Sequence, residues 1–328
     1  MASETAVPLL HVEHLRVEYL TGAGAVKAVD GVSFDIAPGE VLGLAGESGS
    51  GKSTIAHALM RLLHPPAVIA GGTITFQGQD VLALSDRDLE DFRWSQISMV
   101  FQSAMNSLNP VMTIGNQITD AIHAHQKVSK NEALERAAEL LRIVGIESQR
   151  LRSYPHQLSG GMRQRAVIAI ALALQPPLMI MDEPTTALDV VMQKEIMQMI
   201  EELKARLGFS LLFITHDLSL LVEFSDRIAI MYAGEIVEIA PSQEIFTNPL
   251  HPYTRGLMNS FPSLEGPKEL LAGIPGSPPN MLQPPTGCRF HPRCASFLPM
   301  HAQVRPKLRE ASPGHLVACH LYQEGGAA

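Results

Sequence analysis

The sequence predicts an α/β fold built on a mostly parallel sheet, and three observations carry this prediction. A glycine-rich stretch at residues 46–53 fits the pattern G-x-x-x-x-G-K-[ST], with an apolar strand-like run before it and a helix-like run after it. Short apolar runs at residues 178–181, 210–215 and 227–232 alternate with helix-like segments. Because buried parallel strands read as continuous apolar runs, this alternation favours a parallel sheet covered by helices.

The remaining elements follow in chain order from turn signals and hydrophobic periodicity. The strands predicted in the first 80 residues are 10–20, 26–36 and 73–76. Residues 85–165 are polar and helix-like, with 134–144 as an amphipathic piece, and the later predicted helices are 191–207 and 219–224. After about residue 250 the composition changes, and dense Pro and Gly at 262–287 predict a linker or an irregular appended unit.

Composition narrows the class of protein. A hydrophobic fraction of 46% in 328 residues allows an ample core. The net charge of −8 argues against a nucleic-acid partner, which usually demands a basic face. No apolar run reaches the roughly 18 residues of a spanning helix, and the N-terminus lacks the basic and apolar regions of a signal peptide. The chain is therefore expected to be cytosolic.

The glycine-rich stretch has the residues of a phosphate-binding loop. Its glycines allow successive backbone N–H groups to face one concavity, and the helix that follows adds its positive end. Lys52 would reach the β- and γ-phosphates of a nucleotide, and the Ser53 hydroxyl would ligate Mg²⁺. The predicted nucleotide contacts of this loop are Gly46, Ser48, Gly49, Gly51, Lys52, Ser53 and Thr54.

Two further groups suit the same chemistry. Asp182 and Glu183 end the apolar run at 178–181, where Asp182 could hold Mg²⁺ and Glu183 could accept a proton from an attacking water. Ser159 is a good helix N-cap, and the two glycines after it leave backbone N–H groups open to an anion.

With these motifs in order, the chain resembles the ATP-binding-cassette (ABC) ATPases, which are P-loop NTPases. The resemblance covers about residues 8–245 and rests on seven motifs. It implies that Tyr19 stacks on adenine, Gln102 senses Mg²⁺ and the membrane partner, and His216 contacts the γ-phosphate. It also implies that Asp189 lies in the loop that couples two sites, and that Ser159, Gly160, Gly161 and Gln164 form the family's signature. The implied catalytic residues are Lys52, Gln102, Glu183 and His216, and the implied magnesium ligands are Ser53, Gln102 and Asp182.

The resemblance also implies an architecture and a working unit. Residues 1–250 would form the nucleotide-binding domain, with an antiparallel β subdomain and a helical subdomain at about 90–165. Residues 251–328 would form an irregular C-terminal extension. In this family the signature of one subunit meets the ATP held by another, so two ATP molecules are sandwiched between two ATPase subunits.

Several strings narrow the resemblance to importers of oligopeptides and dipeptides, and to the first of their two paired ATPases. They are Phe101 to Pro110, Asp182 to Val190, His251-Pro-Tyr-Thr254 and Ile274-Pro-Gly276. The implied partners are a second ATPase, two membrane permeases and an extracellular solute-binding protein, with the chain on the cytoplasmic face of the membrane. Two alternatives stay open: an importer ATPase for nickel, glycosides or oligosaccharides, and a soluble ABC ATPase that acts on DNA or ribosomes.

The three cysteines all lie after residue 287, and a cytosolic chain is not expected to use them as a disulfide framework. By resemblance to the family's cysteine motif, Cys288, Cys294 and Cys319 with His301 could hold a 4Fe–4S cluster or zinc. His291, His315 and His320 compete for the fourth position. Three reduced thiols with no metal are the alternative.

Overall fold

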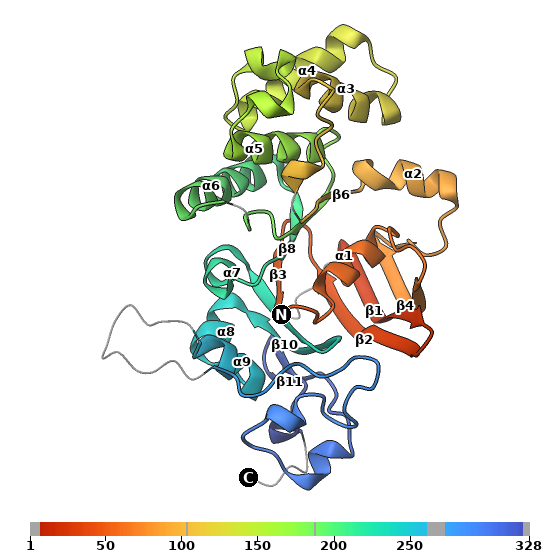
Figure 1. The fold of residues 1–328 in the computed structure, drawn as a ribbon, viewed down its shortest axis with the longest axis vertical. Helices are drawn as coiled ribbons and strands as arrows, with labels where there is room; N and C mark the ends of the chain where they lie inside the picture. The colour runs from red at the N-terminus through yellow and green to blue at the C-terminus, as the bar shows by residue number, and fades with distance from the viewer. Residues whose placement is uncertain (1–6, 103, 187, 261–272, 324–328) are drawn as a thin grey trace, which may run out of the picture. The chain divides into compact units, whose positions relative to one another are not determined.

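The computed structural model describes residues 7–102, 104–186, 188–260 and 273–323. The chain divides into two compact units. One unit comprises residues 1–9, 36–41 and 83–214, and the other comprises residues 10–35, 42–82 and 215–328. Figure 1 colours both along the chain.

The first unit contains three parallel strands with helices around them. The strands are β6 (Ile97–Val100), β7 (Leu178–Asp182) and β8 (Ser210–Ile214), and every residue in them is buried. Its α-helices are α2 (Asp86–Ser95), α3 (Ile114–His125), α4 (Lys130–Ile143), α5 (Gly160–Ala171) and α6 (Val190–Leu207). Short 3₁₀ turns lie at Ala104–Asn106, Ser148–Arg152 and Pro155–Gln157. In Figure 1, α3, α4 and α5 form the yellow and green helical group.

Short polar side chains fix where these helices begin. In each α-helix of this unit the residue before the first turn accepts a hydrogen bond from a backbone N–H inside that turn, which satisfies one of the open donors. The five capping residues are Ser85, Thr113, Ser129, Ser159 and Asp189.

The second unit contains an antiparallel sheet and a mixed set of strands. The antiparallel sheet has the order β2 (Gly24–Ile36), β1 (Leu10–Thr21), β4 (Ala67–Phe76) and β5 (Gln79–Asp80). The mixed set begins with β3 (Val41–Gly46), which pairs in parallel with β9 (Arg227–Tyr232). Next come β10 (Glu235–Pro241), β12 (His315–Val317) and β11 (Arg309–Ser312), all joined antiparallel. The helices are α1 (Lys52–Leu59), α7 (Leu218–Phe224), α8 (Ser242–Thr247) and α9 (Pro252–Met258), with 3₁₀ turns at His291–Arg293, Pro299–Ala302 and His320–Tyr322.

The α/β class and the parallel pairing of the apolar strands are confirmed, and three details of the sequence analysis are corrected. Strand β6 lies inside the segment that was expected to be helical. Strand β4 begins at Ala67, whereas the strand was expected to begin at residue 73. Gly71 and Gly72 therefore lie within the strand, where its register with β1 is irregular. The extension is not wholly irregular, because β12 pairs with β10.

The structure leaves two expectations partly or wholly untested. The proline- and glycine-rich segment at 262–287 lies partly outside the described residues, and its described part has no helix or strand. The predicted domain boundary near residue 250 stays a prediction. Across the described ranges, no helix combines the length and apolar character that a membrane span needs.

Candidate active site

The phosphate-binding loop connects β3 to α1, and its backbone requires glycine. Gly46 has φ 149° and Gly51, the N-cap of α1, has φ 108°. A Cβ on Gly46 would lie 2.2 Å from the Met231 carbonyl oxygen, and one on Gly51 would lie 2.3 Å from the Ala28 carbonyl oxygen. Strands β9 and β2 therefore approach the loop so closely that no side chain fits at either position.

Side chains of this unit then converge on the loop. The Lys52 ammonium donates to the carbonyl oxygens of Gly46, at 2.8 Å, and Glu47, at 3.1 Å, and the residue is only 7% exposed. The hydroxyls of Tyr19 and Thr54 lie 3.4 Å apart, which brings the predicted adenine-stacking side chain of β1 to the first turn of α1. The structure thus places Tyr19, Lys52 and Thr54 at the same loop.

The acidic pair lies at the end of β7 in the other unit. Asp182 is 2% exposed and Glu183 is partly exposed. The Glu183 N–H donates to the Ile214 carbonyl oxygen at 2.8 Å, which continues the β7–β8 pairing by one residue. Glu183 has φ 49°, a left-handed conformation that costs a non-glycine residue free energy and occurs often at functional sites.

Two donors orient the Glu183 carboxylate. Gln102 Nε2 donates to Glu183 Oε2 at 2.9 Å, and Thr186 Oγ1 donates to the same oxygen at 3.0 Å. Gln102 follows β6, so the ends of two neighbouring parallel strands bring the predicted loop glutamine to the predicted base. Thr186 was not singled out as a site residue, although it lies three positions after Glu183 in the same motif.

The signature residues surround the start of α5. The Ser159 hydroxyl accepts from the Met162 N–H at 3.3 Å, so Ser159 acts as the N-cap that its sequence predicts. A Cβ on Gly161 would lie 1.8 Å from Met192 Cε, whereas one on Gly160 would meet nothing nearer than Met105 Sδ at 3.7 Å. Gln164 is 2% exposed, so its side chain lies inside the unit.

The two remaining predicted residues lie at helix starts. Asp189 caps α6 by accepting from the Met192 N–H at 3.0 Å, while Ala187 of the same motif lies outside the described residues. His216 is exposed in the connection between β8 and α7. Lys52, Ser53, Tyr19 and His216 belong to one compact unit, and Gln102, Ser159, Asp182 and Glu183 belong to the other. The assembly of the two sets into one site stays a prediction.

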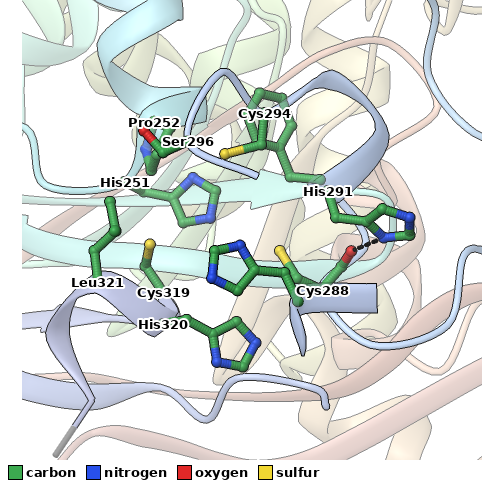
Figure 2. A pocket seen from close by; sticks show the side chains of 11 residues that line it. His251, Pro252, Cys288, His291, Cys294, Ser296, Cys319, His320 and Leu321 are labelled. Atoms are coloured by element: carbon green, nitrogen blue, oxygen red, sulfur yellow. Dashed lines mark hydrogen bonds between the residues drawn. The ribbon is translucent and has the colours of Figure 1, made fainter. Parts of the chain in front are cut away.

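The predicted ligands of the extension line one pocket. Cys288, Cys294, His301 and Cys319 all border it, together with His251, His291 and His320, and Figure 2 shows the three cysteines around it. His315 is not among the lining residues, because its Nε2 lies 2.7 Å from Glu238 Oε1 in a buried contact. The four residues of the predicted ligand set therefore line one pocket, and His315 does not line it.

The pocket as it stands does not present a metal-ligand set. In the described part of the chain, no three His, Cys, Asp or Glu residues are spaced to hold a metal ion. Burial raises the pKa of the Cys288 thiol to about 12 and also raises the pKa values of Cys294 and Cys319, which favours protonated thiols. The rings of His301 and His320 stack with centroids 4.7 Å apart.

Several polar residues that hold the extension in place were not predicted from the sequence. Glu238 is fully buried, and its carboxylate accepts from the N–H groups of Leu250 and His251 at 2.7 and 2.9 Å. Arg289 forms ion pairs with Asp30 and Glu235. The sequence places an arginine beside each of Cys288 and Cys294, but the burial that makes a partner necessary cannot be read from this spacing.

Two family models match the chain. The ABC transporter model matches residues 29–186. The model described as the C-terminal region of oligopeptide/dipeptide transporters matches residues 237–299.

Individual proteins match over almost the whole chain. The dipeptide transport ATP-binding protein DppD of Caldanaerobacter subterraneus subsp. tengcongensis is 45% identical, over 97% of this chain and 98% of that protein. The oligopeptide transport ATP-binding protein OppD of Escherichia coli is 44% identical, over 97% and 95%. A solved dimeric, post-hydrolysis ATP-binding cassette bound to ADP and Pi is 30% identical, with a TM-score of 0.64 over 71% of this chain and 98% of that one.

Proposed function

The chain belongs to the ABC transporter family of ATPases, and from that premise we propose that it powers the import of dipeptides or oligopeptides across a membrane. The observation that carries the proposal is the match over nearly the full chain, including the extension, to ATP-binding proteins of peptide transport. The ATPase subunit does not contact the cargo, and ATPase subunits of importers for other cargoes have the same fold. The match of the C-terminal extension therefore supports peptide import more specifically than the match of the ATPase domain does.

The loop residues bind the nucleotide in this proposal. Backbone N–H groups of Gly49 and Gly51, with the N-terminus of α1, hold the phosphates, and Lys52 exchanges its contacts with loop carbonyls for the β- and γ-phosphates. Tyr19, held beside Thr54, stacks on adenine. Gly46 and Ser48 shape the same loop.

The strand-end residues perform hydrolysis. Glu183, oriented by Gln102 and Thr186, accepts the proton of the attacking water. Mg²⁺, when bound, neutralises charge that develops on the phosphates. This ion prefers oxygen ligands, and Asp182, Ser53 and Gln102 would supply a carboxylate, a hydroxyl and an amide oxygen. The amide oxygen of Gln102 would be the ligand because its Nε2 donates to Glu183. His216 would contact the γ-phosphate.

The assembly follows from the same premise. We assign Ser159, Gly160 and Gly161 to the ATP of a second ATPase subunit, with Gln164 supporting them from inside the helix and Asp189 coupling the two sites. Two permeases and an extracellular solute-binding protein complete the importer, and the chain lies on the cytoplasmic face of the membrane. No nucleic-acid partner is part of the proposal, in keeping with the net charge of −8.

Lys52→Ala tests the ATPase part of the proposal. Loss of a preorganised cation at the phosphates is expected to lower ATP turnover by roughly 100-fold or more. Lys130→Ala removes an exposed lysine at the start of α4 and should leave turnover unchanged. Steady-state phosphate release from the two variants measures this, and equal turnover in both would remove Lys52 from the site.

Uptake by cells tests the cargo. A strain that lacks this gene should take up labelled dipeptides poorly, and the wild-type gene but not the Lys52→Ala gene should restore uptake. If peptide uptake is normal and uptake of nickel, glycosides or oligosaccharides fails instead, the cargo is wrong while the ATPase assignment stands.

A metal in the cysteine pocket stays a prediction from family resemblance and takes no part in the proposed reaction. Binding would displace thiol protons at Cys288, Cys294 and Cys319 and would draw these side chains and His301 closer together than they now lie. If the prediction holds, anaerobically purified protein should contain iron with brown absorbance, or zinc without it. Protein with neither would have three reduced thiols and no metal.

A further inference from the structure

The segment from Cys288 to Cys294 makes a second set of contacts, through the side chains of its two arginines. While the cysteines at its ends line the pocket, Arg289 and Arg293 contact residues around the phosphate-binding loop. All of these residues belong to one compact unit.

Arg293 forms a bidentate ion pair with Glu47, the second residue of the loop. Its Nη1 lies 2.8 Å from Glu47 Oε2, and its Nη2 lies 3.0 Å from Glu47 Oε1. The Arg293 side chain is 6% exposed and that of Glu47 is 24% exposed. Planar, two-point pairing of this kind is both stronger and more directional than an ordinary surface ion pair.

The surroundings fix the Arg293 guanidinium in this position. Its Nε donates to the Pro275 carbonyl oxygen at 2.8 Å, and its Cζ lies 5.7 Å from the Tyr232 ring centroid and 6.0 Å from that of Phe290. Hydrogen bonding to Glu47 raises the pKa of Arg293 further above its already high value. The arginine therefore carries a permanent positive charge, and these contacts hold it beside the loop.

Glu47 is held at its backbone as well as at its side chain. Its N–H donates to Tyr253 Oη at 2.9 Å, and its carbonyl oxygen accepts from Lys52 Nζ at 3.1 Å. Tyr253 belongs to α9, immediately before the extension's proline-rich segment. The entrance of the loop is thus fixed by residues that follow the last β-strands of the cassette.

Arg289 supports the other end of the loop indirectly. It donates to the Ala233 carbonyl oxygen and pairs with Asp30. The next residue, Gly234, donates to the Ser50 carbonyl oxygen at 2.9 Å and accepts from the Asp30 N–H at 2.8 Å. The turn between β9 and β10 therefore joins Arg289 to the loop.

The negative charge of Glu47 is neutralised by Arg293. A carboxylate in a loop that binds a polyphosphate repels its ligand, and the repulsion grows where solvent is excluded. A guanidinium paired with both carboxylate oxygens cancels that charge.

We propose that the C-terminal extension forms part of the nucleotide site, with Arg293 as a positioning residue that neutralises Glu47 and fixes the loop entrance. Nucleotide affinity then depends on the extension. The inference rests on ATP binding by the family's loop and is independent of the transported cargo.

The test compares four full-length variants with the wild type: Arg293→Gln, Glu47→Gln, the double variant and Arg255→Gln. Arg255 is the matched control, because it joins α9 to the Pro249 carbonyl oxygen and to Tyr322 Oη, both at 2.8 Å, and among the described residues it makes no hydrogen bond or ion pair with the loop. Titration with Mg·ADP gives the dissociation constant, and steady-state hydrolysis gives KM and kcat separately.

Arg293→Gln should weaken Mg·ADP binding and raise KM for ATP by about tenfold, which corresponds to about 1.4 kcal/mol, while kcat changes less than about twofold. The double variant should recover most of the lost affinity, because its loop has no unpaired carboxylate. Arg255→Gln should bind like the wild type. A purely structural role for Arg293 predicts no recovery in the double variant.

Wild-type affinity in Arg293→Gln, or a double variant as weak as the single one, would overturn the proposal. If thermal unfolding shows that Arg293→Gln does not fold, Arg293→Lys keeps the charge but not the two-point contact and should weaken binding by about threefold. Unchanged binding in that variant would overturn the positioning role, because the lysine keeps the charge and loses only the two-point contact. A wild-type protein that binds no nucleotide would instead contradict the proposed function.

Discussion

His251 is a fully buried histidine whose hydrogen bonding requires the neutral ring. It is 1% exposed, and its Nδ1 accepts from the Tyr253 N–H at 3.0 Å, which caps α9. Burial lowers the pKa of His251 to about 4, although nearby Glu238 opposes the shift. A proton on Nδ1 would remove the acceptor that starts the helix.

This histidine predicts acid sensitivity over a defined range. Because its folded pKa, about 4, lies below its ordinary 6.5, the unfolded chain binds the proton first. The free energy of unfolding should therefore fall by about 3 kcal/mol as the pH drops from about 6.5 to 4. Urea unfolding at several pH values measures the loss, and His251→Asn, which keeps a capping oxygen, serves as control. An equally steep loss in that variant would assign the acid sensitivity to other groups.

At the scale of elements, the longer runs of continuous apolar residues were predictable as buried strands, whereas the buried strands β10 and β12, which carry charged or titratable side chains, were not. The apolar runs at residues 178–181 and 227–232 predict β7 and β9, because a strand that is buried on both faces is apolar along its length. Strand β10 contains Glu235 and Glu238, and β12 begins with His315. The two buried carboxylates contact partners distant in sequence, His315 for Glu238 and Arg289 for Glu235, which no local pattern reveals.

The candidate site divides in the same way. Motifs that fix their own backbone were predictable: the glycines at 46 and 51 fit their crowded positions, and the cap at Ser159 forms as expected. The cap at Asp189 was not predicted. The contact between Gln102 and Glu183 could not be derived from spacing, because it joins residues 81 positions apart. The Arg293–Glu47 pair spans 246 positions and was missed for the same reason.

At the scale of the whole molecule, we expect the signature at the start of α5 to contact a second ATPase subunit. The capped helix leaves N-terminal N–H groups for an anion, and among the described residues outside its own helix turn, the atom nearest to a Cβ on Gly160 would be Met105 Sδ at 3.7 Å. A dimer closed by ATP needs differential affinity of about 5.5 kcal/mol to go from 1:99 to 99:1. Charge-assisted hydrogen bonds at roughly 1.5–3 kcal/mol each supply this with two to four contacts.

The corresponding prediction uses Glu183→Gln, which should bind ATP but stall hydrolysis, so that the closed dimer accumulates. Light scattering after gel filtration with Mg·ATP should show this dimer, formed by the chain alone or with its paired ATPase. Adding Gly160→Glu should abolish it, because a carboxylate then faces the partner's γ-phosphate. An acidic residue in the first turn of a helix does not harm its own chain, so folding should be preserved. A dimer that persists in the double variant, or wild-type turnover by a strict monomer, would show that α5 does not complete a partner's site.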